Sequence, residues 1–154
     1  MEKIVDKRTM RETIVIDATN NILGRLGARV AKLLLEGYKV VILNAEKAVI
    51  SGSRKFIFQK YKQRSEIKTR TNPRKGPFFY RRPDLFVKRI IRGMLPFSQP
   101  RGRQAFKRLR VYIGEPREFE GIDKVYYSDL NAEVRLRGKF VRVEEISKFL
   151  GWKG

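Results

Sequence analysis

The spacing of apolar residues between positions 13 and 43 changes twice, and this limits the folds open to the chain. An apolar run at 13–16 (TIVI) and another at 39–43 (KVVIL) each read as a short buried strand. The stretch between them carries apolar residues at helical spacing, namely Leu23, Leu26, Val30, Leu33 and Leu34. A strand, a helix and a strand within about thirty residues predict parallel strands joined by a right-handed crossover, in a sheet covered on both faces.

The predicted first helix has recognisable ends. Asn20 or Asn21 is expected to cap its start, and Gly37 is expected to stop it. Gly24 and Gly27 lie inside the helical pattern, and the chain contains neither G-x-G-x-x-G nor G-x-x-x-x-G-K-[ST]. These glycines therefore favour close packing against the sheet or an adjacent backbone over a nucleotide cradle.

The rest of the chain predicts further elements on both sides of a long loop. Between Glu66 and Pro83 periodicity disappears among basic residues and prolines, and a loop of that length is typically functional or disordered. We expect it to order when phosphates neutralise it. Before the loop, a helix is predicted after Ser53 with Phe56, Ile57 and Tyr61 inward. After it, helices are predicted at 84–94 and 99–108, with Phe86 and Phe106 in the core. A half-exposed strand at 109–113, a strand at 139–141 and a helix at 143–150 complete the predicted elements.

Positive charge is concentrated in the middle of the chain. Residues 54–110 hold nineteen of the 36 Lys and Arg residues but only two acids, Glu66 and Asp84, which gives this segment +17 of the formal +20. Charge of this density repels itself, and a polyanion that neutralises it releases condensed counterions. An ordinary solvated surface intersperses both signs. The segment therefore predicts a nucleic-acid partner.

Composition excludes several other classes of function. The chain has no Cys and no His, which removes disulfides, thiolate chemistry, lipid attachment to Cys, and the commonest metal ligand and general base. No apolar run approaches the roughly 18 residues of a membrane span, and the amino terminus lacks a secretory signal. We expect one cytoplasmic domain with no catalytic residues, metal, cofactor, small-molecule substrate or membrane partner.

Two clusters leave alternatives open. Phe78, Phe79 and Tyr80 precede Arg81 and Arg82, so the rings either stack on unpaired bases or anchor the loop on the domain or a neighbouring protein. Carboxylates near element ends either form a catalytic pair or serve as caps and surface ion pairs. Those after the predicted strand bind a cation, repel a nucleic acid or belong to a solvated loop. The simpler interpretation, of caps, ion pairs and a solvated loop, is favoured. These carboxylates are Asp17, Glu36 and Glu46 near element ends, and Glu115, Glu118, Glu120 and Asp123 after the predicted strand.

Three blocks resemble the universal large-subunit ribosomal protein family numbered thirteen. The segment 90–116 carries RGMLP, a Gly, bases and an apolar strand that ends in Gly. IDATNNILGRLGARVAKLLLEG resembles the family's opening strand and helix, and VILNAEKAVISGSRKFIFQKY its second strand and helix. The loop GPFFYRRP and the final FLGWKG are similar to archaeal and eukaryotic members. Residues 1–12 are expected to be an extension, with Met10 as a candidate initiator.

The resemblance implies a three-layer α/β/α single domain over 13–154, around a small parallel or mixed sheet, with a basic loop at 66–83 and a tail at 122–154. It implies a structural, non-enzymatic role in assembly of the large ribosomal subunit, with large-subunit rRNA and neighbouring ribosomal proteins as partners. Gly93, Pro96 and Gly102 are expected to shape the backbone. The expected rRNA contacts are Arg54, Lys55, Lys60, Lys62, Arg64, Lys68, Arg70, Arg74, Lys75, Phe79, Tyr80, Arg81, Arg82, Lys88, Arg89, Arg92, Arg101, Arg103, Lys107 and Arg108.

Two other functions compete with this interpretation. A sequence-tolerant DNA-binding or chromatin protein would also carry this charge. An RNA-binding protein should prefer structured rRNA over duplex DNA at equal salt, and this preference distinguishes the two. An enzyme with a Rossmann-like nucleotide site would be stabilised by ATP or NAD.

Overall fold

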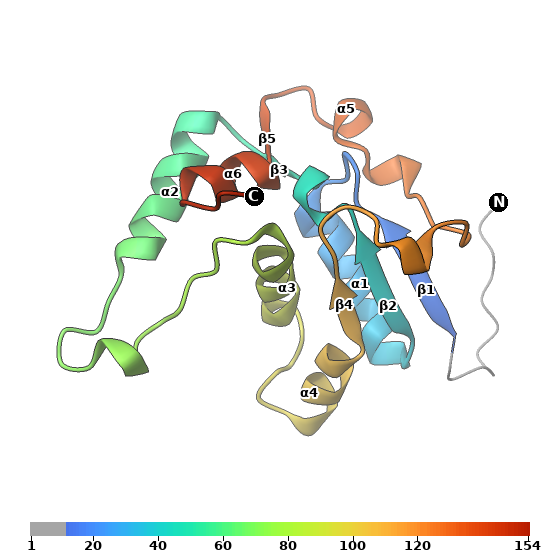
Figure 1. Cartoon of the computed structure of the whole chain (residues 1–154), viewed down its shortest axis with the longest axis horizontal. Helices are drawn as coiled ribbons and strands as arrows, with labels where there is room; N and C mark the ends of the chain where they lie inside the picture. The colour runs from blue at the N-terminus through green and yellow to red at the C-terminus, as the bar shows by residue number, and fades with distance from the viewer. Residues whose placement is uncertain (1–11) are drawn as a thin grey trace.

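The computed structural model describes residues 12–154, which form two small sheets with helices packed against them (Figure 1). The strands are β1 (Thr13–Asp17), β2 (Lys39–Leu43), β3 (Val49–Ser51), β4 (Leu109–Val111) and β5 (Phe140–Arg142). The α-helices are α1 (Leu23–Glu36), α2 (Arg54–Glu66), α3 (Pro83–Gly93), α4 (Pro100–Lys107), α5 (Ala132–Arg135) and α6 (Val143–Phe149).

The larger sheet is parallel and has the order β1-β2-β4. Thr13 pairs with Lys39 and Asp17 with Leu43, while Val40 pairs with Leu109. α1 provides the crossover between β1 and β2, so the predicted strand–helix–strand unit is confirmed. The predicted single α/β domain around a small parallel sheet is likewise what the structure contains.

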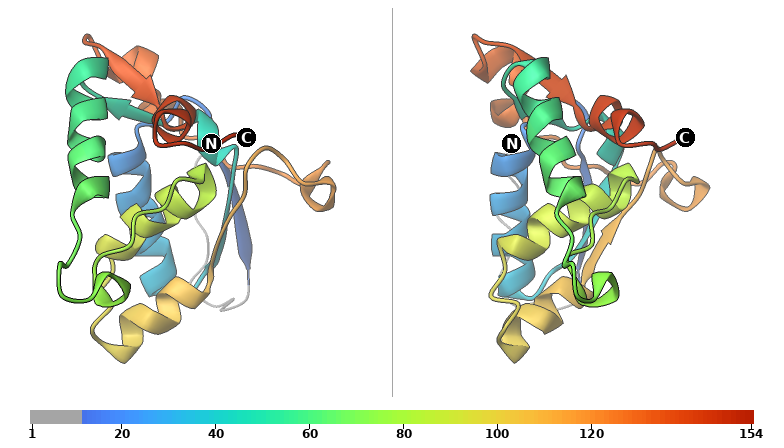
Figure 2. Two further views of the ribbon diagram at one scale, coloured as in Figure 1. Left: turned by 60° about the vertical axis from the view of Figure 1, so that its left-hand side comes forward. Right: turned by 90° about the vertical axis from the view of Figure 1, so that its left-hand side faces the viewer.

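One face of this sheet is covered by helices. Ile16, Val40, Ile42 and Leu109 point into the main core, because alternate residues of a strand face the same side. The helical residues that meet them are Leu26, Val30 and Leu34 of α1 and Val87 and Ile91 of α3. Figure 2 shows α1 and α3 packed beside each other on this side.

The opposite face is narrower and has a different cover. Val15, Val41 and Leu43 form a small cluster with Tyr112 and Phe119. Phe119 belongs to a one-turn 3-10 helix at Arg117–Phe119, so the third layer is a loop with a single turn instead of an α-helix.

The second sheet ties the end of the chain to its middle. β3 and β5 pair in antiparallel fashion, with Val49 opposite Arg142 and Ser51 opposite Phe140. α6 follows β5 directly and packs against α2, where the rings of Phe58 and Phe149 stack with centroids 4.4 Å apart. The carboxyl-terminal segment therefore supports α2, which stands away from the larger sheet (Figure 1).

The ends of α1 differ in part from the prediction. Gly37 ends the helix in the left-handed conformation, with φ of 106°, as its position indicates. The expected Asn cap is wrong, because the N-cap position is Ile22 and no side chain caps the helix. Asn20 instead has a positive φ of 57°, and Asn21 is fully buried with its amide donating to the carbonyl of Asp17.

Glycine and aromatic positions test the packing predictions. Close packing against the sheet or an adjacent backbone was predicted for Gly24 and Gly27. A Cβ at Gly27 would instead lie 2.9 Å from the side-chain sulfur of Met94, at the end of α3, and nothing lies within 4 Å of one at Gly24, where the prediction is wrong. A Cβ at Gly102 would lie 2.0 Å from the carbonyl oxygen of Pro96, so Gly102 does shape this turn. The prediction that Phe56 faces inward is wrong, because it is 63% exposed and Phe58 packs in its place.

Candidate nucleic-acid interface

α2 presents almost all of its length to solvent. Ser53 caps its start by accepting a hydrogen bond from the backbone N–H of Phe56, and Ile57 is its one buried residue. All five of its cations, Arg54, Lys55, Lys60, Lys62 and Arg64, are exposed. Arg54 pairs with Glu145 at 3.0 Å, an exposed contact of small energetic value. The helix thus displays cations around most of its circumference and is attached to the domain on one side.

The segment from α2 to α3 is a loop, as predicted, and it contains one short helical turn that was not predicted. Its single 3-10 turn at Pro73–Lys75 is capped by Asn72, whose side-chain oxygen accepts from the backbone N–H of Arg74 at 3.1 Å. Every base of the loop is exposed, and the set is Lys68, Arg70, Arg74, Lys75, Arg81 and Arg82. Arg82 donates to Asp84 at 3.0 Å, which leaves the other bases of the loop without a carboxylate partner within residues 12–154.

α3 and α4 combine free cations with cations that lie over aromatic rings. Arg89, Arg101, Arg103 and Lys107 are exposed, whereas Lys88 and Arg92 are half-buried. The Lys88 ammonium lies 5.2 Å from the ring centroid of Phe106. The Arg92 guanidinium lies 3.9 Å from that of Phe97. Such cation–π contacts hold the side-chain stems in place while leaving hydrogen-bond donors available to a ligand.

Arg108 has an additional role that the sequence did not predict. Its Nη2 donates to the backbone carbonyl of Leu34 at 2.7 Å, at the carboxyl end of α1. The Leu34 carbonyl also accepts from the backbone N–H of Gly37, and the charge of Arg108 at this end of the helix complements the helix dipole. Arg108 is half-buried, and its Nε has no hydrogen-bond partner among residues 12–154. This residue contributes to the fold whether or not it also contacts a ligand.

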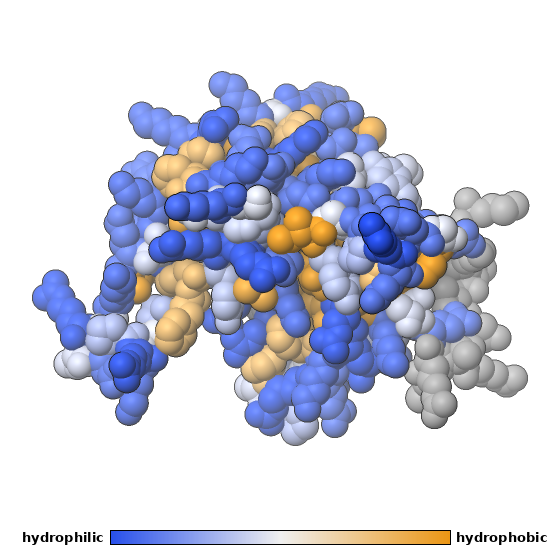
Figure 3. All heavy atoms as spheres, viewed as in Figure 1, coloured by the Kyte–Doolittle hydropathy of each residue, from blue (hydrophilic) through white to orange (hydrophobic). Residues whose placement is uncertain are grey.

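These elements form one surface, which we call the cationic face: α2, the loop 67–82, α3 and α4. Among the ion pairs of residues 12–154, only those of Arg54 and Arg82 involve cations of this face. Figure 3 shows hydrophilic residues over most of one side of the molecule, with apolar residues scattered between them. Most cations of the cationic face therefore have no carboxylate partner within residues 12–154.

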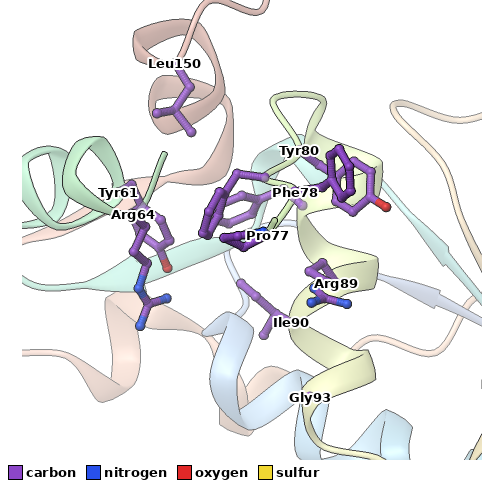
Figure 4. Close-up of a pocket in the computed structure, with 11 residues that line it drawn as sticks. Tyr61, Arg64, Pro77, Phe78, Tyr80, Arg89, Ile90, Gly93 and Leu150 are labelled. Atoms are coloured by element: carbon purple, nitrogen blue, oxygen red, sulfur yellow. The ribbon is translucent and has the colours of Figure 1, made fainter. Parts of the chain in front are cut away.

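An aromatic pocket of about 380 Å³ opens within the cationic face (Figure 4). Tyr61 and Arg64 of α2 line one side, and the loop contributes four consecutive residues to another. Phe86, Arg89, Ile90 and Gly93 of α3 and Leu150 after α6 complete it. Sequence reasoning did not foresee this pocket, because Leu150 and the loop approach one another only in the folded chain.

Three of the carboxylates named from the sequence, Asp17, Glu46 and Glu115, make contacts within the fold. Asp17, at the end of β1, accepts hydrogen bonds from Thr19 and from the side-chain amide of Asn44. Burial raises the pKa of Asp17, but these hydrogen bonds and the charge of Lys124 outweigh burial, so the pKa lies below its usual value. Glu46 accepts from the backbone N–H of Gly114 at 3.0 Å, and Glu115 pairs with Lys124. These contacts agree with the interpretation of the carboxylates as structural groups.

Two further features of the described residues concern metal ions and membranes. Within residues 12–154 no group of three or more acidic side chains is placed to hold a metal ion. None of the helices there combines the length and the apolar character that a membrane crossing requires.

Comparison with known proteins identifies the family. A profile of the family described as "Ribosomal protein L13" matches residues 11–118. The "Large ribosomal subunit protein uL13" of Saccharolobus solfataricus is 45% identical over 148 residues, covering 96% of this chain and 98% of that protein. The protein of the same name from Archaeoglobus fulgidus is 44% identical, covering 91% of this chain and 88% of that protein. The resemblance seen in the three sequence blocks is confirmed, and the chain belongs to the ribosomal protein L13 family, with archaeal relatives.

Proposed function

We propose that the chain is a structural component of the large ribosomal subunit that binds large-subunit rRNA through its cationic face. The observation that carries this proposal is the concentration of exposed cations on α2, the loop 67–82, α3 and α4, with only two acids in residues 54–110. Membership of a ribosomal protein family supports the same conclusion and a non-enzymatic role. The α/β core then serves as the platform that displays this surface.

The proposed mechanism is that cations of the protein neutralise rRNA phosphates where rRNA segments pack closely together. rRNA segments that pack together repel one another, and cations inserted between them lower that repulsion while condensed counterions are released. Arg adds planar donor geometry that suits phosphate, whereas Lys acts as a compact charge. A protein that holds such cations on rigid helices and one long loop stabilises a particular arrangement of rRNA, which is how it would support assembly.

The proposed contacts are the exposed cations and loop rings named from the sequence, together with the half-buried Lys88 and Arg92. Arg108 remains a proposed contact, although its Nη2 is already used within the fold. Neighbouring large-subunit proteins are proposed to meet the carboxyl-terminal part of the chain, residues 111–154, which holds eight bases and eight acids. Exposed apolar residues support this, since Ile122, Tyr126 and Val134 are 45%, 47% and 77% exposed.

A charge reversal tests the proposal directly. Lys68 and Arg70 lie in the loop, are exposed and have no ion-pair partner within residues 12–154. The double variant Lys68→Glu, Arg70→Glu is expected to weaken binding to a large-subunit rRNA fragment by tenfold or more. Wild-type affinity should fall by roughly a thousandfold or more between 50 and 200 mM salt if six to ten phosphates are neutralised.

The matched control is Arg137→Glu with Lys139→Glu, which has the same spacing and charge change but lies on exposed positions outside the cationic face. It should bind the fragment nearly as well as the wild type. Equal losses in the two double variants, or an affinity that does not respond to salt, would contradict the proposal. Duplex DNA at equal salt should compete poorly, because the face is proposed to fit structured RNA.

A further inference from the structure

The aromatic pocket differs from the rest of the cationic face in its lining. Tyr61, Phe78, Phe79, Tyr80 and Phe86 surround it, and Pro77, Ile90 and Leu150 add apolar surface. Tyr61 and Phe86 meet edge to face with centroids 5.1 Å apart, which makes a fixed wall. Phe78 remains 62% exposed and Tyr80 43% exposed, so rings at the opening still have faces free to contact a ligand.

The polar groups of this pocket are all cationic or neutral. Arg64 and Arg89 line it and no carboxylate does, so its charge suits an anionic ligand with an apolar part. The Arg64 guanidinium lies 5.7 Å from the ring centroid of Tyr61, which positions it beside the pocket wall. A volume of about 380 Å³ falls within the range of small-molecule sites, roughly 300–1,000 Å³.

A second pocket adjoins the first and shares two residues with it. This basic pocket, of about 280 Å³, is lined by Tyr80, Leu85, Lys88, Arg89, Arg92, Phe97 and Phe106. Tyr80 and Arg89 also line the aromatic pocket. Lys88 and Arg92 are held over Phe106 and Phe97, whose rings themselves meet edge to face at 5.5 Å. An apolar pocket and a pocket of three cations thus lie on either side of the same Tyr and Arg.

We propose that these two pockets together bind one unpaired rRNA nucleotide, with its base in the aromatic pocket and an adjoining backbone phosphate in the basic pocket. An unpaired base that has left the RNA stack can stack instead on the aromatic side chains of the pocket. Such stacking accepts any base, because every base has a flat aromatic face. The phosphate meets Lys88, Arg89 and Arg92, which gives charge complementarity without any carboxylate in either lining. The inference rests on the proposed rRNA-binding function and names the nucleotide class that this part of the face would take.

The probe is a single-stranded hexaribonucleotide with 2-aminopurine at one internal position, titrated into the full-length chain. Stacking on a ring should quench 2-aminopurine fluorescence. A second hexamer that is abasic at the same position keeps the phosphates and removes the base. The wild type should bind the intact hexamer at least fivefold more tightly than the abasic one, since stacking contributes roughly 1 to 3 kcal/mol per base.

Two Phe→Leu variants provide a matched pair. Phe78 lines the aromatic pocket and is 62% exposed, while Phe56 lies on α2 outside the pocket lining and is 63% exposed. Phe78→Leu should lower the preference for the intact hexamer and reduce quenching, whereas Phe56→Leu should change neither. Arg89→Gln should weaken binding of both hexamers and reduce the salt dependence, because it removes a phosphate contact shared by both probes.

Three results would overturn the inference: equal affinity for the intact and abasic hexamers, equal effects of the two Phe→Leu variants, or saturable binding of an apolar peptide that excludes the hexamer. The large-subunit rRNA fragment separates this failure from a failure of the proposed function. If the fragment still binds with strong salt dependence, only the nucleotide site is wrong. If the fragment does not bind at all, the proposed function is wrong as well.

Discussion

α1 and α2 have almost the same length, 14 and 13 residues, but α1 packs into the core whereas α2 is largely exposed to solvent. α1 buries six residues between the sheet and α3, and its cations and apolar residues lie on separate sides. α2 buries Ile57 alone and is basic around most of its circumference. A helix of this length is marginal in water without tertiary packing. α1 is therefore specified by the core of the protein, whereas α2 retains a sequence that suits a partner.

The contacts beneath α2 show how little holds it. Phe58 stacks on Phe149 of α6, and Tyr61 meets Phe86 of α3, so two rings and Ile57 attach the helix to the domain. Its cations are not separated by any acid before Glu66, and Lys60 and Arg64 lie one turn apart, where like charges are destabilising. Phosphates bound along the helix would relieve this repulsion, so binding and local stability should be coupled.

The largest expected effect comes from the core side of α1. Leu26 is fully buried, and Leu26→Ala should lower the free energy of unfolding by about 2–5 kcal/mol through lost burial and a cavity. The corresponding truncation on α2, Phe56→Ala, should change it by less than about 0.5 kcal/mol because the ring is exposed. Urea unfolding of both variants measures the difference. Similar losses would show that the two helices are not distinguished in this way.

The turn before α4 should give the next largest effect. A Cβ at Gly102 would lie 2.0 Å from the backbone oxygen of Pro96, so Gly102→Ala should cost about 1–3 kcal/mol as the turn shifts. Gly93 provides the control, because it lies in α3 with nothing within 4 Å of its added Cβ. Gly93→Ala should leave stability unchanged or raise it by up to about 1 kcal/mol. Thermal unfolding followed by circular dichroism distinguishes the two, and an unchanged midpoint for Gly102→Ala would mean that the turn adapts freely.

The elements that the sequence predicts well are those defined by their own neighbours. β1, α1 and β2 follow from apolar spacing within one stretch, and α3 and α4 begin at Pro83 and Pro100, within one residue of the predicted starts. The short strand β5 was predicted one residue early, whereas β3 was missed; the two strands pair across some ninety residues, and this contact leaves no local pattern in the sequence. Phe56 and Phe58 could not be told apart for the same reason, since the ring that selects Phe58 is Phe149.

The candidate site likewise combines features that the local sequence predicts with features that depend on contacts between distant segments. Segregation of charge is a property of the sequence, and the structure keeps the named cations on the surface, with Lys88, Arg92 and Arg108 half-buried. The inward hydrogen bond of Arg108 and the pocket that joins Tyr61 to Leu150 depend on contacts between distant segments. Charge density therefore predicted a nucleic-acid partner, while the two pockets that we propose as a nucleotide site became visible only in the fold.

The smallest expected effect on stability comes from Lys60→Glu on α2. This variant should separate the two helices clearly, because it should raise stability while it weakens rRNA binding. Lys60→Glu places a carboxylate one turn before Arg64, which replaces repulsion with an i,i+4 ion pair and should raise the free energy of unfolding by about 0.5 kcal/mol. The same variant should weaken binding of the rRNA fragment and lower the salt slope by about 0.9 for the lost phosphate contact.

Lys32→Glu on α1 is the matched control, since Lys32 is exposed and already lies one turn before Glu36. This substitution places two carboxylates one turn apart and should not raise stability, because the nearby Arg29 is paired with Asp129. Binding of the rRNA fragment should keep its salt slope, because α1 lies outside the cationic face. Paired urea unfolding and salt titrations measure both quantities. If Lys60→Glu lowers stability, or Lys32→Glu lowers the salt slope equally, then α2 is no more specialised for a partner than α1.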